Sequence, residues 1–130
     1  MYLKYLLLSS NQNIEPSFES DYLEYTEETE GEFIVIKYKD LENNEASLRV
    51  SNNEAQIIFN GNKMDLALKR KVSNTFYFGE IKITFDCFLT SIVVKNKIIE
   101  LNYDLLQNDT IIVSNIARFE FYKEKGGQLK

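Results

Sequence analysis

The sequence predicts an all-β fold: a single up-and-down antiparallel β-barrel of about 8–10 strands. Hydrophobic residues make up 44% of the chain, which contains nine Phe, eight Tyr and no Trp. This composition is typical of pleated, half-buried strands rather than of helices. Short clusters of Asn, Asp and Gly recur along the chain. These residues tolerate the positive φ that hairpin turns require, so they are expected to separate the strands.

The predicted strands follow one another with short links. Residues 2–8 and 21–26 form the first two, on either side of an irregular stretch that contains Pro16. The remaining strands are expected at 33–39, 45–50, 54–59, 63–71, 75–86, 89–95, 98–106 and 110–122. Turns are expected at Asn43-Asn44, Asn52-Asn53, Asn60-Gly61, Ser73-Asn74, Asn96 and Asn108-Asp109. Hairpin-short links favour pairing between neighbours in sequence, and therefore a barrel over a Greek-key sandwich.

The barrel domain is expected to span residues 1–123, followed by a flexible C-terminal tail at 124–130. Alternation within the strands then indicates which side chains face the interior, because successive side chains of a strand point to opposite faces. In one run these are Met64, Leu66 and Leu68, and in another Ile99, Leu101, Tyr103 and Leu105. The run 75–86 leaves two phases open. Either Tyr77 and Ile81 face inward, or a bulge at Gly79-Glu80 brings Phe76 and Phe78 inside.

Several stretches carry a family resemblance. They are Tyr22-Leu23-Glu24-Tyr25, the turn and strand from Phe59-Asn60-Gly61 to Leu66, the segment Phe76-Tyr77-Phe78-Gly79 with Ile81 and Ile83, and the segment from Ile99 to Leu105. With these pieces the chain resembles, over roughly residues 20–122, the YwiB-like family of small bacterial proteins, a lipocalin-like (calycin-type) barrel group of unknown function. The resemblance implies a lipocalin/calycin-like barrel with an interior cavity, without naming a ligand.

The residue content narrows the classes of function. The chain has no His and one Cys, Cys87, which removes the commonest general base and leaves no thiolate cluster to bind a metal. No phosphate-binding loop or nucleophile elbow is present. We therefore expect no enzyme activity, no cofactor and no metal site. A net charge of −5, without clustered Lys and Arg, argues against nucleic acid as a partner.

The N-terminal run Tyr2 to Leu8 is apolar but interrupted by Lys4. It is too short for a signal peptide or a membrane span and is interpreted as a first strand. A single cysteine implies no intramolecular disulfide. A cytoplasmic protein with no membrane partner is expected.

An acidic segment stands out near the N-terminus: Glu24, Glu27, Glu28, Glu30 and Glu32. The preferred interpretation is a solvated hairpin between two strands. The alternatives are a weak cation site or a docking patch for a basic partner.

A barrel of about eight strands is just wide enough to be filled by side chains or to hold one small ligand. The candidate ligand-binding residues share the expected inward phase: Met64, Leu68, Arg70, Tyr77, Tyr103, Asn115 and Phe119. Here Arg70 and Asn115 would orient the ligand, and an Arg would suit a carboxylate. The alternative is that Arg70 lies in water at a strand end and Asn115 only satisfies a strand neighbour.

Two functions are therefore considered. The first is non-catalytic binding of a small apolar or amphipathic molecule inside the barrel. The second is a protein-interaction or structural module, including a homodimer, that uses an apolar outer face. The residues expected on that face are Ile112, Ile116, Tyr122, and Phe76 with Phe78.

Overall fold

The computed structural model describes residues 1–9, 18–40 and 42–126, and every regular element in these ranges is a β-strand. In chain order the strands are β1 (Tyr2–Ser9), β2 (Phe18–Glu19), β3 (Leu23–Glu30), β4 (Phe33–Lys39), β5 (Glu45–Val50), β6 (Glu54–Phe59), β7 (Asn62–Ala67), β8 (Lys71–Phe78), β9 (Ile81–Val94), β10 (Ile98–Gln107) and β11 (Thr110–Tyr122). The expected irregular stretch around Pro16 and the tail residues 127–130 lie outside the described residues. Within the described ranges, no helix is long and apolar enough to cross a membrane.

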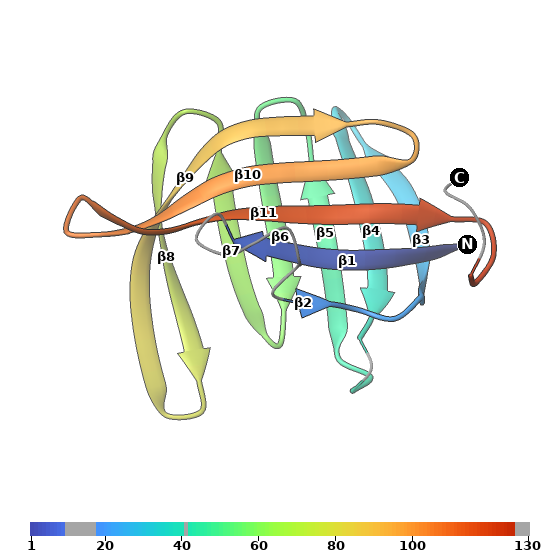
Figure 1. Ribbon diagram of the computed structural model, residues 1–130, viewed down its shortest axis with the longest axis horizontal. Coiled ribbons are helices and arrows are strands. Elements are labelled where there is room, and N and C mark those ends of the chain that lie inside the picture. Colours follow the sequence, from blue (N-terminus) through green and yellow to red (C-terminus); the bar gives the residue numbers. More distant parts are fainter. Residues whose placement is uncertain (10–17, 41, 127–130) are drawn as a thin grey trace.

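The order of the strands confirms the predicted antiparallel, up-and-down barrel (Figure 1). Hydrogen-bonded neighbours follow the order β7-β6-β5-β4-β3-β1-β11-β10-β9-β8, with β2 alongside β1. The first and last long strands pair from Tyr2 opposite Tyr122 to Ser9 opposite Asn115. In Figure 1, β3 to β7 lie behind β1, β10 and β11 and run across them. The sheet therefore folds over on itself, and its two ends, β7 and β8, come together.

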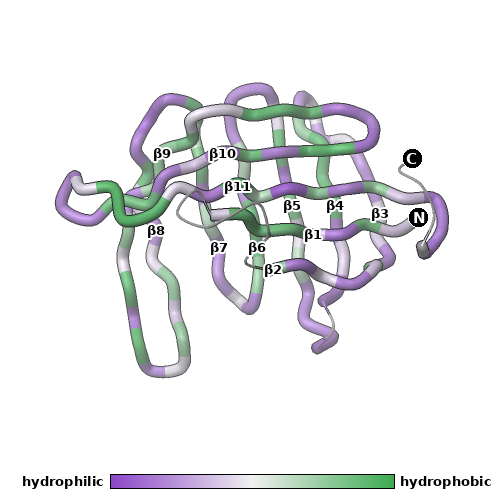
Figure 2. The backbone as a smooth tube through the Cα atoms, viewed as in Figure 1, coloured by the Kyte–Doolittle hydropathy of each residue, from purple (hydrophilic) through white to green (hydrophobic). Residues whose placement is uncertain are grey.

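The core lies between the two halves of the folded sheet. Buried and less buried residues alternate along β5 and β10, and hydrophobic residues are concentrated in the strands (Figure 2). Leu48, Leu101 and Phe119, which come from three different strands, have no exposed surface and belong to one apolar cluster. Removal of this surface from water is the main favourable term for such a fold. The predicted inward faces of 63–67 and 98–105 are confirmed.

Two buried asparagines join the ends of the sheet where backbone pairing is sparse. The Asn62 side chain accepts a hydrogen bond from the Tyr77 N–H at 2.7 Å and donates one to the Tyr77 carbonyl at 3.1 Å. From the opposite strand, the Asn74 side chain accepts from the Asp65 N–H at 2.8 Å and donates to the Asp65 carbonyl at 2.9 Å. Each amide thus presents to the facing strand the donor and acceptor of a peptide group. We call these four contacts the asparagine seam.

The expected run 75–86 is two strands rather than one. β8 ends at Phe78 and β9 begins at Ile81, with a two-residue turn at Gly79-Glu80 in which Gly79 has φ +64°. Phe76 is buried and Tyr77 is 57% exposed. The phase with Phe76 inside is therefore correct, and the phase with Tyr77 inside is wrong. The cause is a hairpin and not the bulge that was the second alternative, because a chain that reverses at Gly79 restarts its alternation.

Two other boundaries also differ from the prediction. The strand expected to end at residue 71 stops at Ala67, because Lys69 adopts φ +60° and a bridge between Ala67 and Arg70 reverses the chain. The turn expected at Ser73-Asn74 lies inside β8, and the run expected at 89–95 continues β9 without a break. Asn is common in turns because it tolerates positive φ, but the Asn74 amide is used by the asparagine seam.

Replacement of Asn74 by Ala is expected to lower the free energy of unfolding by about 1–3 kcal/mol, because it leaves the partly buried N–H and carbonyl of Asp65 without their partners. Urea unfolding measures this loss, and faster amide hydrogen exchange at Asp65 would locate it. The matched control is Asn44→Ala, whose exposed amide makes one long contact of 3.4 Å to Asn60 and should cost less than about 0.5 kcal/mol. Equal losses in the two variants would contradict the structural role of the seam.

Candidate functional site

A cavity of about 570 Å³ opens at the end of the barrel that carries the β4–β5 and β6–β7 turns and the β8–β9 hairpin (Figure 1). Ligand sites for small molecules usually measure about 300–1,000 Å³ and are lined mainly by apolar and aromatic side chains with a few polar groups. This cavity fits that description. Its walls are formed by three groups of residues: a phenylalanine wall, three tyrosines, and a polar rim.

The phenylalanine wall combines β6, β8 and β9. Phe76 lies between Phe59 and Phe85, with ring centroids 6.0 Å and 6.2 Å apart in tilted arrangements. Such spacing is favourable for aromatic pairs. Phe78 follows Phe76 by two residues on β8, is 53% exposed and extends the same wall towards the mouth of the cavity. Met64 and Leu105 complete the apolar lining from β7 and β10.

Three tyrosines reach the cavity from different strands: Tyr5 on β1, Tyr38 on β4 and Tyr103 on β10. Burial raises the pKa of Tyr5 to about 12. Burial also raises the pKa values of Tyr38 and Tyr103, and the nearby Tyr5 raises both further. All three hydroxyls are therefore neutral at physiological pH. The Asn115 side chain forms a hydrogen bond with Tyr103, from the residue directly opposite on β11.

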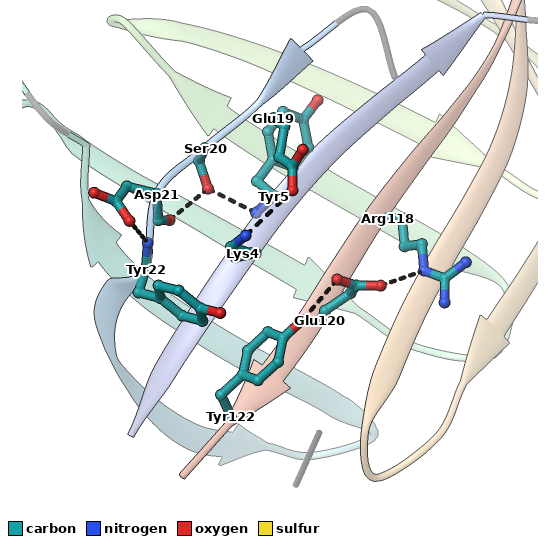
Figure 3. Close-up of polar contacts among 9 residues, drawn as sticks. All are labelled: Lys4, Tyr5, Glu19, Ser20, Asp21, Tyr22, Arg118, Glu120 and Tyr122. Atoms are coloured by element: carbon teal, nitrogen blue, oxygen red, sulfur yellow. Dashed lines mark hydrogen bonds and ion pairs between the residues drawn. The ribbon is translucent and has the colours of Figure 1, made fainter. Parts of the chain in front are cut away.

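The short segment that contains β2 forms one side of the cavity and is fixed to β1 (Figure 3). The Tyr5 N–H donates to Ser20 Oγ at 2.8 Å, and the Ser20 N–H donates to the Tyr5 carbonyl at 2.9 Å. Lys4 Nζ binds Glu19 Oε1 at 3.2 Å on the outer side. Since side chains alternate, Phe18 and Ser20 then line the cavity while Glu19 does not.

The outer face of β11 is polar by contrast over its C-terminal part, from Arg118 to Tyr122 (Figure 3). Arg118 Nε lies 3.1 Å from Glu120 Oε2, too poorly aligned for a hydrogen bond, and Nη1 lies 3.8 Å from Glu100 Oε2. The Tyr122 hydroxyl donates to Glu120 Oε1 at 2.9 Å. Partly exposed ion pairs of this kind contribute little to stability. They place charge on the outside of the wall and leave the inner face of β11 to apolar packing.

The polar rim of the cavity consists of the β4–β5 and β6–β7 turns. Asp40 Oδ1 accepts hydrogen bonds from the N–H groups of Glu42 and Asn44, both at 2.9 Å, and so shapes the first turn. Glu42 is exposed at the rim. Asn60 forms the rim of the second turn, with φ +48°. The rim thus has two carboxylates, and the described residues that line the cavity include no Lys or Arg.

The structure brings some of the sequence-predicted site residues together. Met64 and Tyr103 line the cavity. Asn115 lies behind the lining and forms a hydrogen bond with the Tyr103 hydroxyl. Phe119 is fully buried and supports Tyr5, with ring centroids 5.0 Å apart.

Three other predicted site residues lie away from the cavity. Leu68 packs against the core at its bridge to Leu89. Arg70 is not inward as expected, because the chain reverses before it. Its side chain borders a small groove on the outer face of the barrel, with Arg49 and Glu54. Tyr77 points outward because of the hairpin at Gly79 and contributes its backbone to the seam.

Sequence reasoning missed Tyr5, Tyr38, Phe76, Phe85 and Asp40 as site residues. The signal for the two tyrosines was present. Tyr5 alternates with Leu3 and Leu7, and Tyr38 alternates with Ile34 and Ile36. The inward position of Phe76 required the hairpin at Gly79 to be recognised, whereas Phe85 already shared the expected inward phase with Ile81. The position of Asp40 at the mouth depends on tertiary closure, which no local pattern encodes.

Comparison with known proteins gives a structural likeness. No family model and no curated protein matches the sequence. The fold is similar to that of the YwiB protein from Bacillus subtilis, whose crystal structure aligns with a TM-score of 0.58 at 8% sequence identity. The alignment covers 94% of this chain and 89% of that chain. The likeness concerns the fold alone and supports the YwiB-like architecture that the sequence resemblance implies.

The free energy of unfolding is expected to fall as the pH rises from about 10 to about 12. An unfolded tyrosine loses its proton near pH 10, whereas burial raises the pKa of Tyr5 to about 12. The neutral Tyr5 hydroxyl therefore contributes its full stabilisation below pH 10, the pKa in the unfolded chain. This contribution is lost as the pH rises towards the pKa of Tyr5 in the folded protein. The free energy of unfolding of the Tyr5→Phe variant should fall less steeply over this interval than that of the parent protein. The difference between the two slopes should reach up to about 1.4 kcal/mol per pH unit.

Urea unfolding at a series of alkaline pH values measures this difference. Tyr77→Phe removes an exposed hydroxyl and controls for the substitution itself. If the Tyr5 and Tyr77 variants follow the same pH dependence, the Tyr5 hydroxyl is not enclosed as described.

Proposed function

We propose that this protein is a non-catalytic binding module, which holds one small apolar or amphipathic molecule in the cavity of about 570 Å³. The observation that carries the proposal is the combination of the phenylalanine wall with three neutral tyrosine hydroxyls. The apolar wall would take the body of the ligand through the hydrophobic effect. The hydroxyls would fix its orientation by hydrogen bonds, as a few polar groups do in most small-molecule sites. The lipocalin-like family resemblance supports the same use of a barrel interior.

Binding rather than catalysis is proposed because the one cysteine, the strongest nucleophile in the sequence, does not line the cavity. Cys87 is fully buried in the core. Burial raises the pKa of its thiol, which disfavours the nucleophilic thiolate. The neutral tyrosines are suited to hydrogen bonding with a bound molecule.

Replacement of Leu105 by Trp is expected to fill the cavity and weaken binding of the neutral dye phenylnaphthylamine by about tenfold or more. Dye fluorescence, titrated with the protein, measures the affinity. The matched control is Val93→Trp, on the outer face opposite Glu100, which should keep the parent affinity. Circular dichroism and cooperative unfolding verify that both variants fold. A parent protein that gives no saturable dye binding, together with native mass spectrometry that finds no retained small molecule, would overturn the proposal.

A second candidate function is a protein-interaction module, favoured by exposed large hydrophobic residues on the two hairpins that project from the barrel (Figure 2). Tyr77 and Ile81 are 57% and 61% exposed on the β8–β9 hairpin, and Ile111 and Ile112 are 55% and 45% exposed on the β10–β11 hairpin. Exposed apolar clusters mark contact surfaces more often than scattered residues do. Of the face expected from the sequence, Ile112 and Phe78 are exposed and Ile116 and Tyr122 partly so, whereas Phe76 is buried and does not belong to it.

If these hairpins mediate self-association, Ile81→Lys or Ile112→Lys should shift a concentration-dependent dimer towards monomer in sedimentation velocity. Thr84→Lys, on an exposed position of the same β9 strand, is the control and should leave the distribution unchanged. A parent protein that remains monomeric at all concentrations would eliminate the homodimer.

A further inference from the structure

The charged side chains that line the cavity are all negative. Asp40 and Glu42 lie at its rim, and none of the described residues that line it carries a positive charge. The nearest lysines along the chain, Lys37 and Lys39, border a separate open groove on the outside. Lys37 Nζ is also paired with Glu28 at 2.9 Å. The whole chain also has a net charge of −5, so its overall field favours a cation over an anion.

Behind the rim, the tyrosine hydroxyls that line the cavity are neutral, and those of Tyr5 and Tyr38 have no hydrogen-bond partner among the described residues. Tyr5 is partly buried against the core and lines the cavity. A hydroxyl that faces the cavity without a protein partner can form a hydrogen bond with a bound molecule. The cavity therefore offers hydrogen bonds to a bound molecule in addition to the rim carboxylates.

The tyrosine and phenylalanine rings add a further preference. Aromatic faces carry partial negative charge and attract amines and quaternary ammonium groups within about 6 Å. Anionic head groups meet the opposite conditions here, since a bound carboxylate would lie near Asp40 and Glu42 with no guanidinium or ammonium group to pair with. The same cavity therefore discriminates between amphiphiles by the sign of their head group.

We propose that the ligand of this cavity is a cationic amphiphile, with a hydrocarbon or aromatic body against the phenylalanine wall and an amine or quaternary ammonium group at the carboxylate rim. The inference rests on the proposed function and specifies its ligand class. It replaces the carboxylate ligand that the sequence suggested through Arg70, since Arg70 lies outside the cavity.

A matched series of probes tests the inference: decyltrimethylammonium, decanol and decanoate, each used to displace phenylnaphthylamine at low ionic strength. We expect the cationic probe to bind about tenfold more tightly than decanoate, with decanol between them. Added salt should narrow the difference, because rim charges are screened. In the double variant Asp40→Asn, Glu42→Gln the cationic probe and decanoate should bind with equal affinity. Asn at position 40 keeps the side-chain oxygen that accepts from the turn N–H groups.

The control for overall charge is the double variant Glu24→Gln, Glu45→Gln, at the outer groove, which changes the net charge equally and should keep the preference. If decanoate binds as tightly as the cationic probe, or if both double variants behave alike, the inference fails while binding itself stands. If the dye and all three probes fail to bind, the proposed function fails, and the inference with it.

Discussion

The asparagine seam is the constraint on which the rest of the structure depends. A β-sheet gains its barrel shape when its two end strands meet, and here those strands, β7 and β8, are joined largely by the side chains of Asn62 and Asn74. Closure brings Met64 next to the phenylalanine wall and therefore gives the cavity its far side. It also provides hydrogen-bond partners for some of the N–H and carbonyl groups on these two edge strands. The buried polarity of the seam is satisfied, which makes it a specific junction as well as a stable one.

The interior of the barrel is packed at one end and hollow at the other. Towards one end, fully buried residues such as Leu48, Leu101 and Phe119 fill the space. Towards the other, tyrosines and phenylalanines leave about 570 Å³ unfilled. Large aromatic side chains are rigid, so a ring of them can surround a space without collapsing into it. The segment fixed on β1 by Ser20 and the Lys4–Glu19 pair then supplies a side that the long strands do not provide.

Much of this architecture could be predicted from the sequence because its signals are local. The alternation of Ile99, Leu101 and Tyr103 and the turn at Asn60-Gly61 each follow from neighbouring residues alone. The predicted strand boundaries were wrong where one residue type occurs in two kinds of local structure. Asn74 resembles a turn residue but serves the seam, and Gly79 resembles a bulge but forms a hairpin. Most of the site came from tertiary closure: Tyr103 and Met64 were found by phase, whereas Asp40, Phe76 and Phe85 meet across strands that are distant in sequence.

The pairing of β1 with β11 has a consequence for how the chain acquires its shape. Tyr2–Ser9 finds its principal partner in Thr110–Tyr122, at the other end of the sequence. Contacts of such long range are slow to form, because a large loop must close before they contribute. During synthesis the first strand leaves the ribosome long before its partner exists, with Leu3 and its apolar neighbours uncovered. An emerging chain of this kind is exposed to aggregation until its last strand is made. The strand that completes the sheet is thus also the one that ends this vulnerable interval.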